Sequence, residues 1–315
     1  MHKRPFISVI INNYNYARFL PAAIQSVLDQ EDFTDYEIIV VDDASLDHSQ
    51  AVLKSYGNKI SCIFHYKNQG QGAAFYSGLQ ASQGEWICFL DADDLFEKNK
   101  LVHVAKKAEQ NPDALLIYHL GYYVDETTKS FAKPFPSRTY RDGNIKKHIL
   151  STGETLLPPT SFLTFKRSFL EKILPMDPFL SRIDADFPLQ VMAGIMGKIV
   201  SIKKPLGFYR LHGNNWYSND DFLKLSQETL LQITRRTEKS YYHINRLLKQ
   251  HGMKERIDLL NHRFYRRNLY IFNHLSVWKL LFYPWFHPNF EGWMDKWNYL
   301  AFGLRRRRMY LNSEQ

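Results

Sequence analysis

The stretch CFLDADDLF, residues 88–96, joins an apolar run to three carboxylates at Asp91, Asp93 and Asp94. The apolar run, which begins near residue 85, predicts a short buried strand. Carboxylates this close together raise one another's pKa unless a cation relieves the repulsion. All-oxygen ligands suit a hard divalent ion, Mg²⁺ or Mn²⁺. The end of this strand is therefore a candidate metal site, with a solvated acidic turn as the alternative.

Strand-like and helix-like segments alternate on the N-terminal side of this stretch. We expect strands at 6–11, 37–41, 59–66 and 85–90, and helices at 16–30, 44–56 and 70–82. This alternation predicts a parallel sheet with helices on its faces, in which ligands bind beyond the carboxyl ends of the strands. Polar residues follow every one of these strands: Asn12 to Asn15, Asp42 and Asp43, Lys67 and Asn68, and Asp91 to Asp94.

The middle of the chain has a less regular pattern. It predicts helices at 99–110 and 186–198, strands at 114–124 and 199–202, and a strand that runs into a helix over 160–173. The polar residues 125–155 are expected to form a loop over the site. From residue 219 onward the spacing of apolar residues is helical, and Arg, Tyr, Trp and His are frequent.

Composition and charge restrict the class of protein. The chain has 315 residues, of which 44% are hydrophobic, enough for a large packed core. Its two cysteines lie in apolar runs and are expected to be reduced core thiols. No stretch is apolar enough for a secretory signal or a membrane span. Residues 222–315 carry 17 Lys and Arg against 7 Asp and Glu, a charge of +10, whereas residues 1–221 come to −1.

Four segments occur in an order that is typical of one enzyme family. They are ISVIINNYNYARFLPAAIQSVLDQ, YEIIVVDDASLDHS, NQGQGAAFYSGLQASQGEWICFLDADD and YRLHGNN. Together they resemble the signature of inverting family 2 glycosyltransferases, over about residues 5–215. The resemblance implies an α/β GT-A fold: a Rossmann-like, mostly parallel sheet with helices on both faces, here with a C-terminal helical extension. It also implies a nucleotide-sugar donor, a divalent metal and an acceptor hydroxyl.

The resemblance divides the chain into functional regions. Residues 1–218 would be the catalytic domain, with a nucleotide-sugar half at about 1–96 and an acceptor half at about 97–218. Residues 219–315 would be a basic, aromatic-rich helical region. The residues that the resemblance implies for binding the nucleotide sugar are Asn12, Tyr14, Asp43, Gln71 and Asp91.

The same resemblance assigns metal ligands. Asp93 would ligate the ion, with Asp91 beside the ribose and the metal, and His212 would meet the metal or the diphosphate. Asp94 would support this shell or cap the next helix. Arg210 would pair with a phosphate or an acidic residue. Many relatives have Arg and Asn at the positions of Phe75 and Tyr76, so a cationic diphosphate contact from that helix is in doubt.

The acceptor half must supply a base. The family pattern aligns Asp186 with the residue that removes the proton of the acceptor hydroxyl, and Asp184 is the second choice. The alternative is that both aspartates simply favour the start of a helix. Thr160 and Ser161, which follow the polar loop, are expected on the acceptor side by position only.

The basic C-terminal region is compatible with more than one kind of partner. Aromatic and cationic residues over 277–308 suit a membrane surface, although burial against the core or a homodimer through the same helices would use them too. The expected acceptor is a carbohydrate or a lipid-linked sugar, the expected donor is a UDP-sugar, and no nucleic-acid partner is expected. The expected location is cytoplasmic, with peripheral contact on the inner face of the membrane.

Two other classes of function are compatible with parts of the sequence. A basic nucleic-acid or lipid-binding protein would explain the charged tail and make the acidic cluster incidental. A nucleotidyltransferase would also bring a metal and a nucleotide to such a sheet, but the N-terminus lacks the glycine-rich loop with a following Arg or Lys. A dinucleotide oxidoreductase is disfavoured because no G-x-G-x-x-G follows the first strand.

Overall fold

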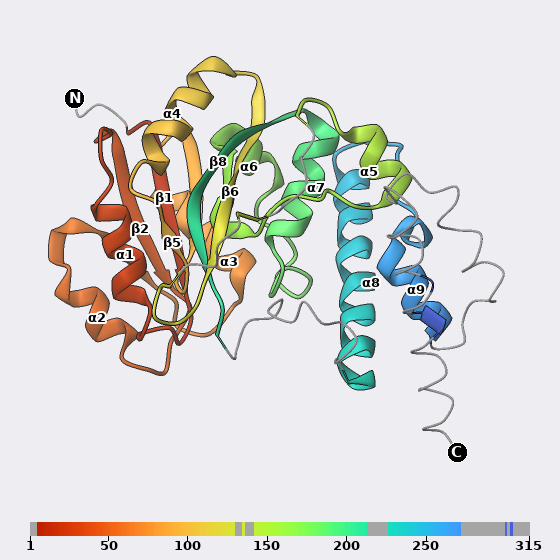
Figure 1. Cartoon of the computed structure of the whole chain (residues 1–315), viewed down its shortest axis with the longest axis horizontal. Helices are drawn as coiled ribbons and strands as arrows, with labels where there is room; N and C mark the ends of the chain where they lie inside the picture. The colour runs from red at the N-terminus through yellow and green to blue at the C-terminus, as the bar shows by residue number, and fades with distance from the viewer. Residues whose placement is uncertain are drawn as a thin grey trace. The chain divides into compact units, whose positions relative to one another are not determined.

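The computed structural model of the chain describes residues 5–129, 134–135, 142–212, 226–271, 300 and 303–304 (Figure 1). It contains an eight-stranded sheet with the strand order β3-β2-β1-β4-β7-β6-β8-β5. The chain divides into two compact units. Residues 1–145 and 156–215 form the first, which contains the sheet, and residues 146–155 and 216–315 form the second.

The first half of the sheet is parallel, as the sequence predicts. Its strands are β1 (Ile7–Asn13), β2 (Tyr36–Asp42), β3 (Ser61–Phe64) and β4 (Trp86–Asp91). In the parallel register, Asn12 lies opposite Asp91 and Asn13 lies opposite Asp42. The polar strand ends therefore meet at one edge of the sheet. The helices of this half are α1 (Leu20–Leu28), α2 (Ser49–Ser55) and α3 (Gln71–Ala81), with the 3-10 turn η1 (Gly57–Lys59).

Helices cover both faces of this half, because β1 is apolar on both sides. Ile7, Val9 and Ile11 belong to a buried cluster with apolar residues of α1 and of α4 (Lys100–Gln110). Ile10 points to the opposite face, where a Cβ at Gly78 of α3 would lie 2.4 Å from its Cγ2. The α/β class with a mostly parallel sheet and helices on both faces is thus confirmed.

The second half of the sheet contains the antiparallel strands. The four-residue β7 (Leu163–Lys166) lies antiparallel between β4 and β6 (Ala114–Val124), and β5 (Leu95–Phe96) lies antiparallel to β8 (Lys198–Arg210). β6 and β8 are parallel. The 3-10 turn η2 (Thr160–Phe162) precedes β7, and α6 (Arg167–Ile173) and α7 (Asp186–Met196) complete the first unit. β8 is much longer than the predicted strand at 199–202.

Part of the predicted loop at 125–155 is regular structure. Lys146–Thr152 form the helix α5, and Gly143 pairs with Ile199 in an isolated bridge. The prediction of a loop is wrong here because the polar composition conceals the apolar anchors Ile145 and Ile149, which are both buried. The free cysteines Cys62 and Cys88 agree with reduced thiols, although only Cys88 is fully buried.

The regular elements described in the second unit are all helical. It contains α5, α8 (Gln227–Gln250), the turn η3 (Leu259–Asn261) and α9 (Arg263–Ile271). Ser226 caps α8, since its hydroxyl accepts a hydrogen bond from the nitrogen of Thr229 at 3.1 Å. The predicted boundary at residue 218 stays a prediction. The predicted contact surface at 277–308 lies outside the described residues except for 300, 303 and 304. None of the described helices has the length and apolar character needed to cross a membrane.

Candidate active site at the carboxyl ends of the strands

Two strand ends meet at Asn12 and Asp91. The side-chain nitrogen of Asn12 donates a hydrogen bond to Oδ1 of Asp91 at 2.8 Å. The buried Oδ1 of Asn12 has no hydrogen-bond partner in the described part of the chain. A buried oxygen without a donor is unusual and favours a ligand at this point.

A compact set of hydrogen bonds supports the loop that carries Asp91, Asp93 and Asp94. The hydroxyl of Ser161 donates to Asp94 at 2.6 Å and accepts from the nitrogen of Asp91 at 3.0 Å. Arg210 donates its backbone N–H to Asp94 at 2.9 Å and its Nε–H to the carbonyl of Asp93 at 2.7 Å. Asp94 is 1% exposed, which agrees with the supporting role expected for it. Ser161, which bonds to both Asp91 and Asp94, is fully buried.

The carboxyl groups of this loop are held in an unfavourable setting for negative charge. Burial raises the pKa of Asp91 to about 7, and the nearby Asp93 and Asp186 add to the rise. Burial and the charge of Asp93 also raise the pKa of Asp94. The cause is crowding of buried carboxylates, which a bound cation would relieve.

The residues at this edge fit a divalent ion whose remaining coordination positions are filled by a bound ligand. Oδ2 of Asp93 lies 2.9 Å from Nε2 of His212. Adjacent ligands of an octahedral ion, each at about 2.1 Å, are about 3 Å apart. Within the described ranges, no group of three or more His, Cys, Asp or Glu side chains is arranged to hold a metal. Two protein ligands are nevertheless sufficient for Mg²⁺ or Mn²⁺ where substrate phosphates and water supply the rest.

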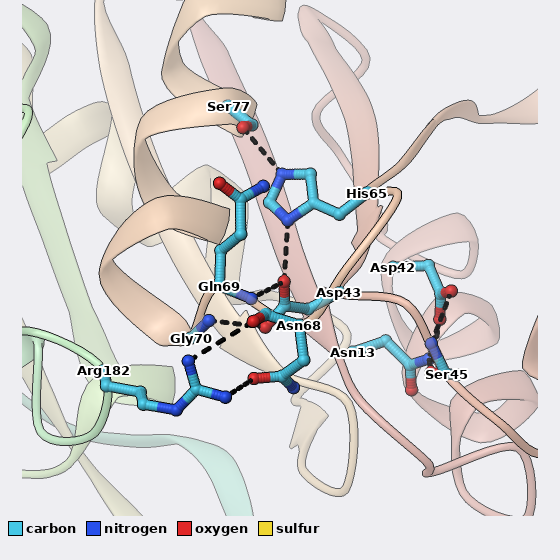
Figure 2. Close-up of polar contacts among 10 residues, drawn as sticks. All are labelled: Asn13, Asp42, Asp43, Ser45, His65, Asn68, Gln69, Gly70, Ser77 and Arg182. Atoms are coloured by element: carbon cyan, nitrogen blue, oxygen red, sulfur yellow. Dashed lines mark hydrogen bonds and ion pairs between the residues drawn. The ribbon is translucent and has the colours of Figure 1, made fainter. Parts of the chain in front are cut away.

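Asp43 lies at the centre of a second polar cluster (Figure 2). Its carboxylate accepts hydrogen bonds from the backbone nitrogens of Gln69 at 2.8 Å and Gly70 at 2.7 Å, and it lies 2.7 Å from Nδ1 of His65. Nε2 of His65 lies 2.8 Å from the hydroxyl of Ser77 on α3. His65 was not expected at the site, because it lies inside the strand-like run 59–66 that precedes Lys67 and Asn68.

Asp42, the neighbour of Asp43, has a structural role. It accepts hydrogen bonds from the side chains of Asn13 at 2.7 Å and Ser45 at 2.6 Å, and from the nitrogen of Ser45 at 3.1 Å. These bonds close the turn that follows β2. Asp42 is fully buried, so it faces the turn and not the open edge.

Gly70 allows two distant segments to approach closely. Its φ of +90° lies in the left-handed region, and a Cβ there would lie 2.6 Å from Cα of Arg182. The next two nitrogens, of Gln71 and Gly72, donate to the carbonyls of Arg182 at 3.0 Å and Ser181 at 2.9 Å. The guanidinium of Arg182 donates in turn to the side chain and the carbonyl of Asn68 (Figure 2).

Gln71 and Asp186 extend this arrangement to α7. Oε1 of Gln71 accepts a hydrogen bond from the nitrogen of Ala185 at 2.9 Å, and its Nε2 lies 3.4 Å from Oδ1 of Asp91. Asp186, the first residue of α7, accepts a hydrogen bond from Gln190 at 3.1 Å. Burial, followed by the charge of Asp184, raises the pKa of Asp186 to about 6, and a hydrogen bond from Thr160 acts in the opposite direction.

The predicted site residues thus lie in three connected places. Asn12, Gln71 and Asp91 form one hydrogen-bonded group, with Asp186 close enough to raise the pKa of Asp91. Asp93 and His212 form a pair beside it, and Asp43 is joined to the group through residues 69–71. Tyr14 follows the end of β1, is 40% exposed, and forms no hydrogen bond with these residues in the described part of the chain.

Comparison with known proteins identifies the family. The family model described as "Glycosyl transferase family 2" matches residues 8–174, more than half of the chain. The chain belongs to glycosyl transferase family 2. It is accordingly a glycosyltransferase, a transferase of EC class 2.4, and this membership decides against the nucleotidyltransferase alternative. An uncharacterized glycosyltransferase of Nostoc sp. is 37% identical over 269 residues, which cover 84% of this chain and 82% of the relative.

Solved structures show that this family 2 chain has the GT-A fold. S. aureus TarS 1-349 in complex with UDP-GlcNAc matches with a TM-score of 0.56 and 16% identity, over 98% of this chain and 92% of that one. The mannosyltransferase PcManGT from Pyrobaculum calidifontis, in complex with GDP-Man and Mn²⁺, matches with a TM-score of 0.54 and 14% identity, over 98% and 76%. At this identity the likeness concerns the fold alone.

Proposed function

We propose that this family 2 glycosyltransferase transfers a sugar from a nucleotide diphosphate sugar to an acceptor hydroxyl with inversion at the anomeric carbon. The observation that carries the proposal is the connection between Asp91 at a strand end and Asp186 at the start of α7. Gln71 contacts both Asp91 and the backbone of Ala185, so a donor group and a base belong to one site. Such a site brings a donor and an attacking hydroxyl together.

The donor would bind along the carboxyl edge of the sheet. Asn12, Tyr14 and Asp43 would hold the nucleoside, with Asp43 accepting from the edge of the base and the exposed ring of Tyr14 beside it. Gln71 and Asp91 would contact the ribose and the sugar diphosphate. Similar structures in complex with UDP-GlcNAc and GDP-Man support a nucleotide-sugar donor, and we favour a UDP-sugar.

A divalent ion, Mn²⁺ or Mg²⁺, would be held by Asp93 and His212, with Asp91 beside the ion and the ribose. Such an ion, when bound, stabilises negative charge on a departing diphosphate. The 2.9 Å separation of Asp93 and His212 and the raised pKa of Asp91 support this assignment. A complex of PcManGT with Mn²⁺ supports it at the level of the fold.

Asp186 would act as the base. Its carboxylate would take the proton of the acceptor hydroxyl while the oxygen attacks the anomeric carbon from the side opposite the leaving diphosphate. This in-line displacement inverts the anomeric configuration. A base with a pKa of about 6 is charged at neutral pH and still accepts a proton readily. Gln190 would orient the carboxylate through its 3.1 Å hydrogen bond.

The acceptor would be a carbohydrate or a lipid-linked sugar in the synthesis of a bacterial surface polysaccharide, lipopolysaccharide or glycolipid. The charge of +10 over residues 222–315 supports a peripheral contact with an anionic membrane surface on its cytoplasmic face. The same region would also serve for a homodimer.

A donor screen tests the proposed function. The thermal stability of the full chain is measured with UDP-, GDP- and dTDP-sugars, each with and without Mn²⁺. At least one donor should raise the melting temperature only when the metal is present, since ligands that bind the native state stabilise it. Absence of metal-dependent binding for every donor would contradict the proposal.

A further inference from the structure

The carboxylate of Asp43 has most of its accepting capacity filled by the chain itself (Figure 2). Oδ1 accepts from the nitrogen of Gln69 at 2.8 Å and lies 2.7 Å from Nδ1 of His65. Oδ2 accepts from the nitrogen of Gly70 at 2.7 Å. Each carboxylate oxygen has two lone pairs. Oδ1 is therefore filled, and Oδ2 retains one position for a ligand.

His65 keeps this arrangement in either of its charge states. A carboxylate only accepts, so Nδ1 of His65 carries the hydrogen that it shares with Asp43. Nε2 of the neutral ring accepts from the hydroxyl of Ser77 at 2.8 Å, and Nε2 of the charged ring donates to it. The side chains of His65 and Asp43 are only 6% and 5% exposed. The ring is thus fixed at both nitrogens, between the end of β3 and α3.

We propose that His65 is a positioning residue that sets which nucleotide base the enzyme accepts. By filling Oδ1 of Asp43, it leaves the carboxylate able to accept one N–H group from a base. The inference rests on the proposed function, in which Asp43 contacts the edge of the base. It goes further than the comparisons. Solved structures similar to this chain contain UDP-GlcNAc in one case and GDP-Man in another, so the similarity does not indicate whether this chain binds uracil or guanine.

The number of N–H groups on the base decides the selection. Uracil and thymine have one ring N–H, on N3, which matches the single free position on Oδ2. Guanine has two adjacent donors, on N1 and on the exocyclic N2, which pair with both oxygens of one carboxylate. At Asp43 only one of these two donors would find an acceptor. The other would be removed from water on binding and would have no hydrogen-bond partner. An unpaired donor in a buried site lowers affinity, so Asp43 with His65 favours uracil or thymine.

The test measures the dissociation constants of UDP and GDP for the full chain by calorimetry in the presence of Mn²⁺. The wild type should bind UDP roughly 10-fold or more tightly than GDP, the ratio expected for one hydrogen bond to a charged group. His65→Ala should reduce this ratio by a similar factor, because it frees a lone pair on Oδ1. His65→Leu, which fills the space of the ring without a donor, is a second variant in case the alanine variant does not fold.

Two variants control for loss of structure. His65→Asn retains an N–H that can donate to Oδ1 and should keep most of the preference for UDP. Ser77→Ala removes only the far hydrogen bond of the ring and should leave the ratio unchanged. A Ser77→Ala ratio that falls as far as that of His65→Ala would overturn the inference, because the effect would then come from loosening of the cluster.

The outcomes for the wild type separate this inference from the proposed function. Binding of GDP as tightly as UDP, or more tightly, overturns the role of His65 and leaves the nucleotide-sugar donor in place. Absence of Mn²⁺-dependent binding of both nucleotides by the folded wild type overturns both. A preference for UDP that His65→Ala and His65→Leu leave intact also overturns the inference, since the selection would then lie elsewhere.

Discussion

The side-chain oxygen of Gln71 accepts a hydrogen bond from the backbone nitrogen of Ala185 at 2.9 Å. Gln71 is the first residue of α3 and Ala185 directly precedes α7, so one hydrogen bond joins the start of α3 to the residue before Asp186. The other end of the same side chain lies 3.4 Å from Asp91. Displacement of the start of α3 would therefore affect the placement of Asp186, the proposed base.

Asp186→Asn should lower the rate of transfer strongly and preserve donor binding. The amide has nearly the shape of the carboxylate but does not accept a proton, and loss of a general base lowers rates by about 10²- to 10⁴-fold. The measurements are kcat and the dissociation constant of the donor. Asp184→Asn is the matched control and should retain most of its activity. Loss of donor binding by a folded Asp186→Asn variant would instead place Asp186 on the donor side.

The rate of transfer should depend on pH through Asp186. Burial and the charge of Asp184 raise the pKa of Asp186 from 3.8 to about 6. A base works only when deprotonated, so kcat should be level above pH 6 and fall about tenfold per pH unit below it. Asp184→Asn should shift the midpoint to lower pH, because it removes a negative charge that raises the pKa. A level profile down to pH 5 would count against Asp186 as the base.

Gly70→Ala should destabilise the protein by about 2 kcal/mol or more, from strain at φ +90° and a Cβ placed 2.6 Å from the backbone of Arg182. Gly57→Ala is the matched control. Its φ is +53°, with no atom within 4 Å of the added Cβ, so only a backbone cost of about 1 kcal/mol is expected. Urea unfolding compares the two variants. Equal losses of unfolding free energy in the two variants would mean that the backbone around Arg182 moves to accommodate the new methyl group.

Lys100 should make stability depend on pH. Its ammonium donates to the carbonyl of Ser161 at 2.8 Å and lies 3.4 Å from the ring centre of Phe96, and burial lowers its pKa from 10.5 to about 7. Between these values the unfolded chain binds more protons than the folded chain. The free energy of unfolding should therefore rise with pH from 7 toward 10, by up to about 1.4 kcal/mol per pH unit.

Lys100→Met isolates this contribution, because the variant has no group that titrates at this position. Urea unfolding at pH 7, 8 and 9 should show a steeper rise for the wild type than for Lys100→Met. The same slope in both proteins would mean that the ammonium group is not desolvated in the folded state.

The strands and their polar ends could be predicted from the sequence because their signals are local. The apolar run before Asp91 is β4, and parallel pairing of β1 with β2 and β4 brings Asn12 opposite Asp91. The antiparallel insertion of β7 could not be predicted in this way. Its pairing of Thr164 with Cys88 spans 76 residues, and a four-residue strand carries too little pattern to specify a partner.

The supporting residues of the site were missed for the same reason. His65 reads as part of an apolar strand, and its contact with Asp43 depends on the pairing of β2 with β3. Arg182 contacts Asn68 across 114 residues of sequence. The local signal for the contact between His65 and Asp43 was a histidine near the carboxyl end of a predicted strand.

The central claim is that the carboxyl edge of the sheet binds a nucleotide sugar with a divalent ion. Its most direct test is calorimetric titration of the preferred donor into wild type and Asp93→Asn, each with and without Mn²⁺. The account predicts that Mn²⁺ tightens binding to the wild type at least about tenfold, and that Asp93→Asn, folded, loses this gain. Equal tightening by Mn²⁺ in both proteins would contradict a metal site at Asp93.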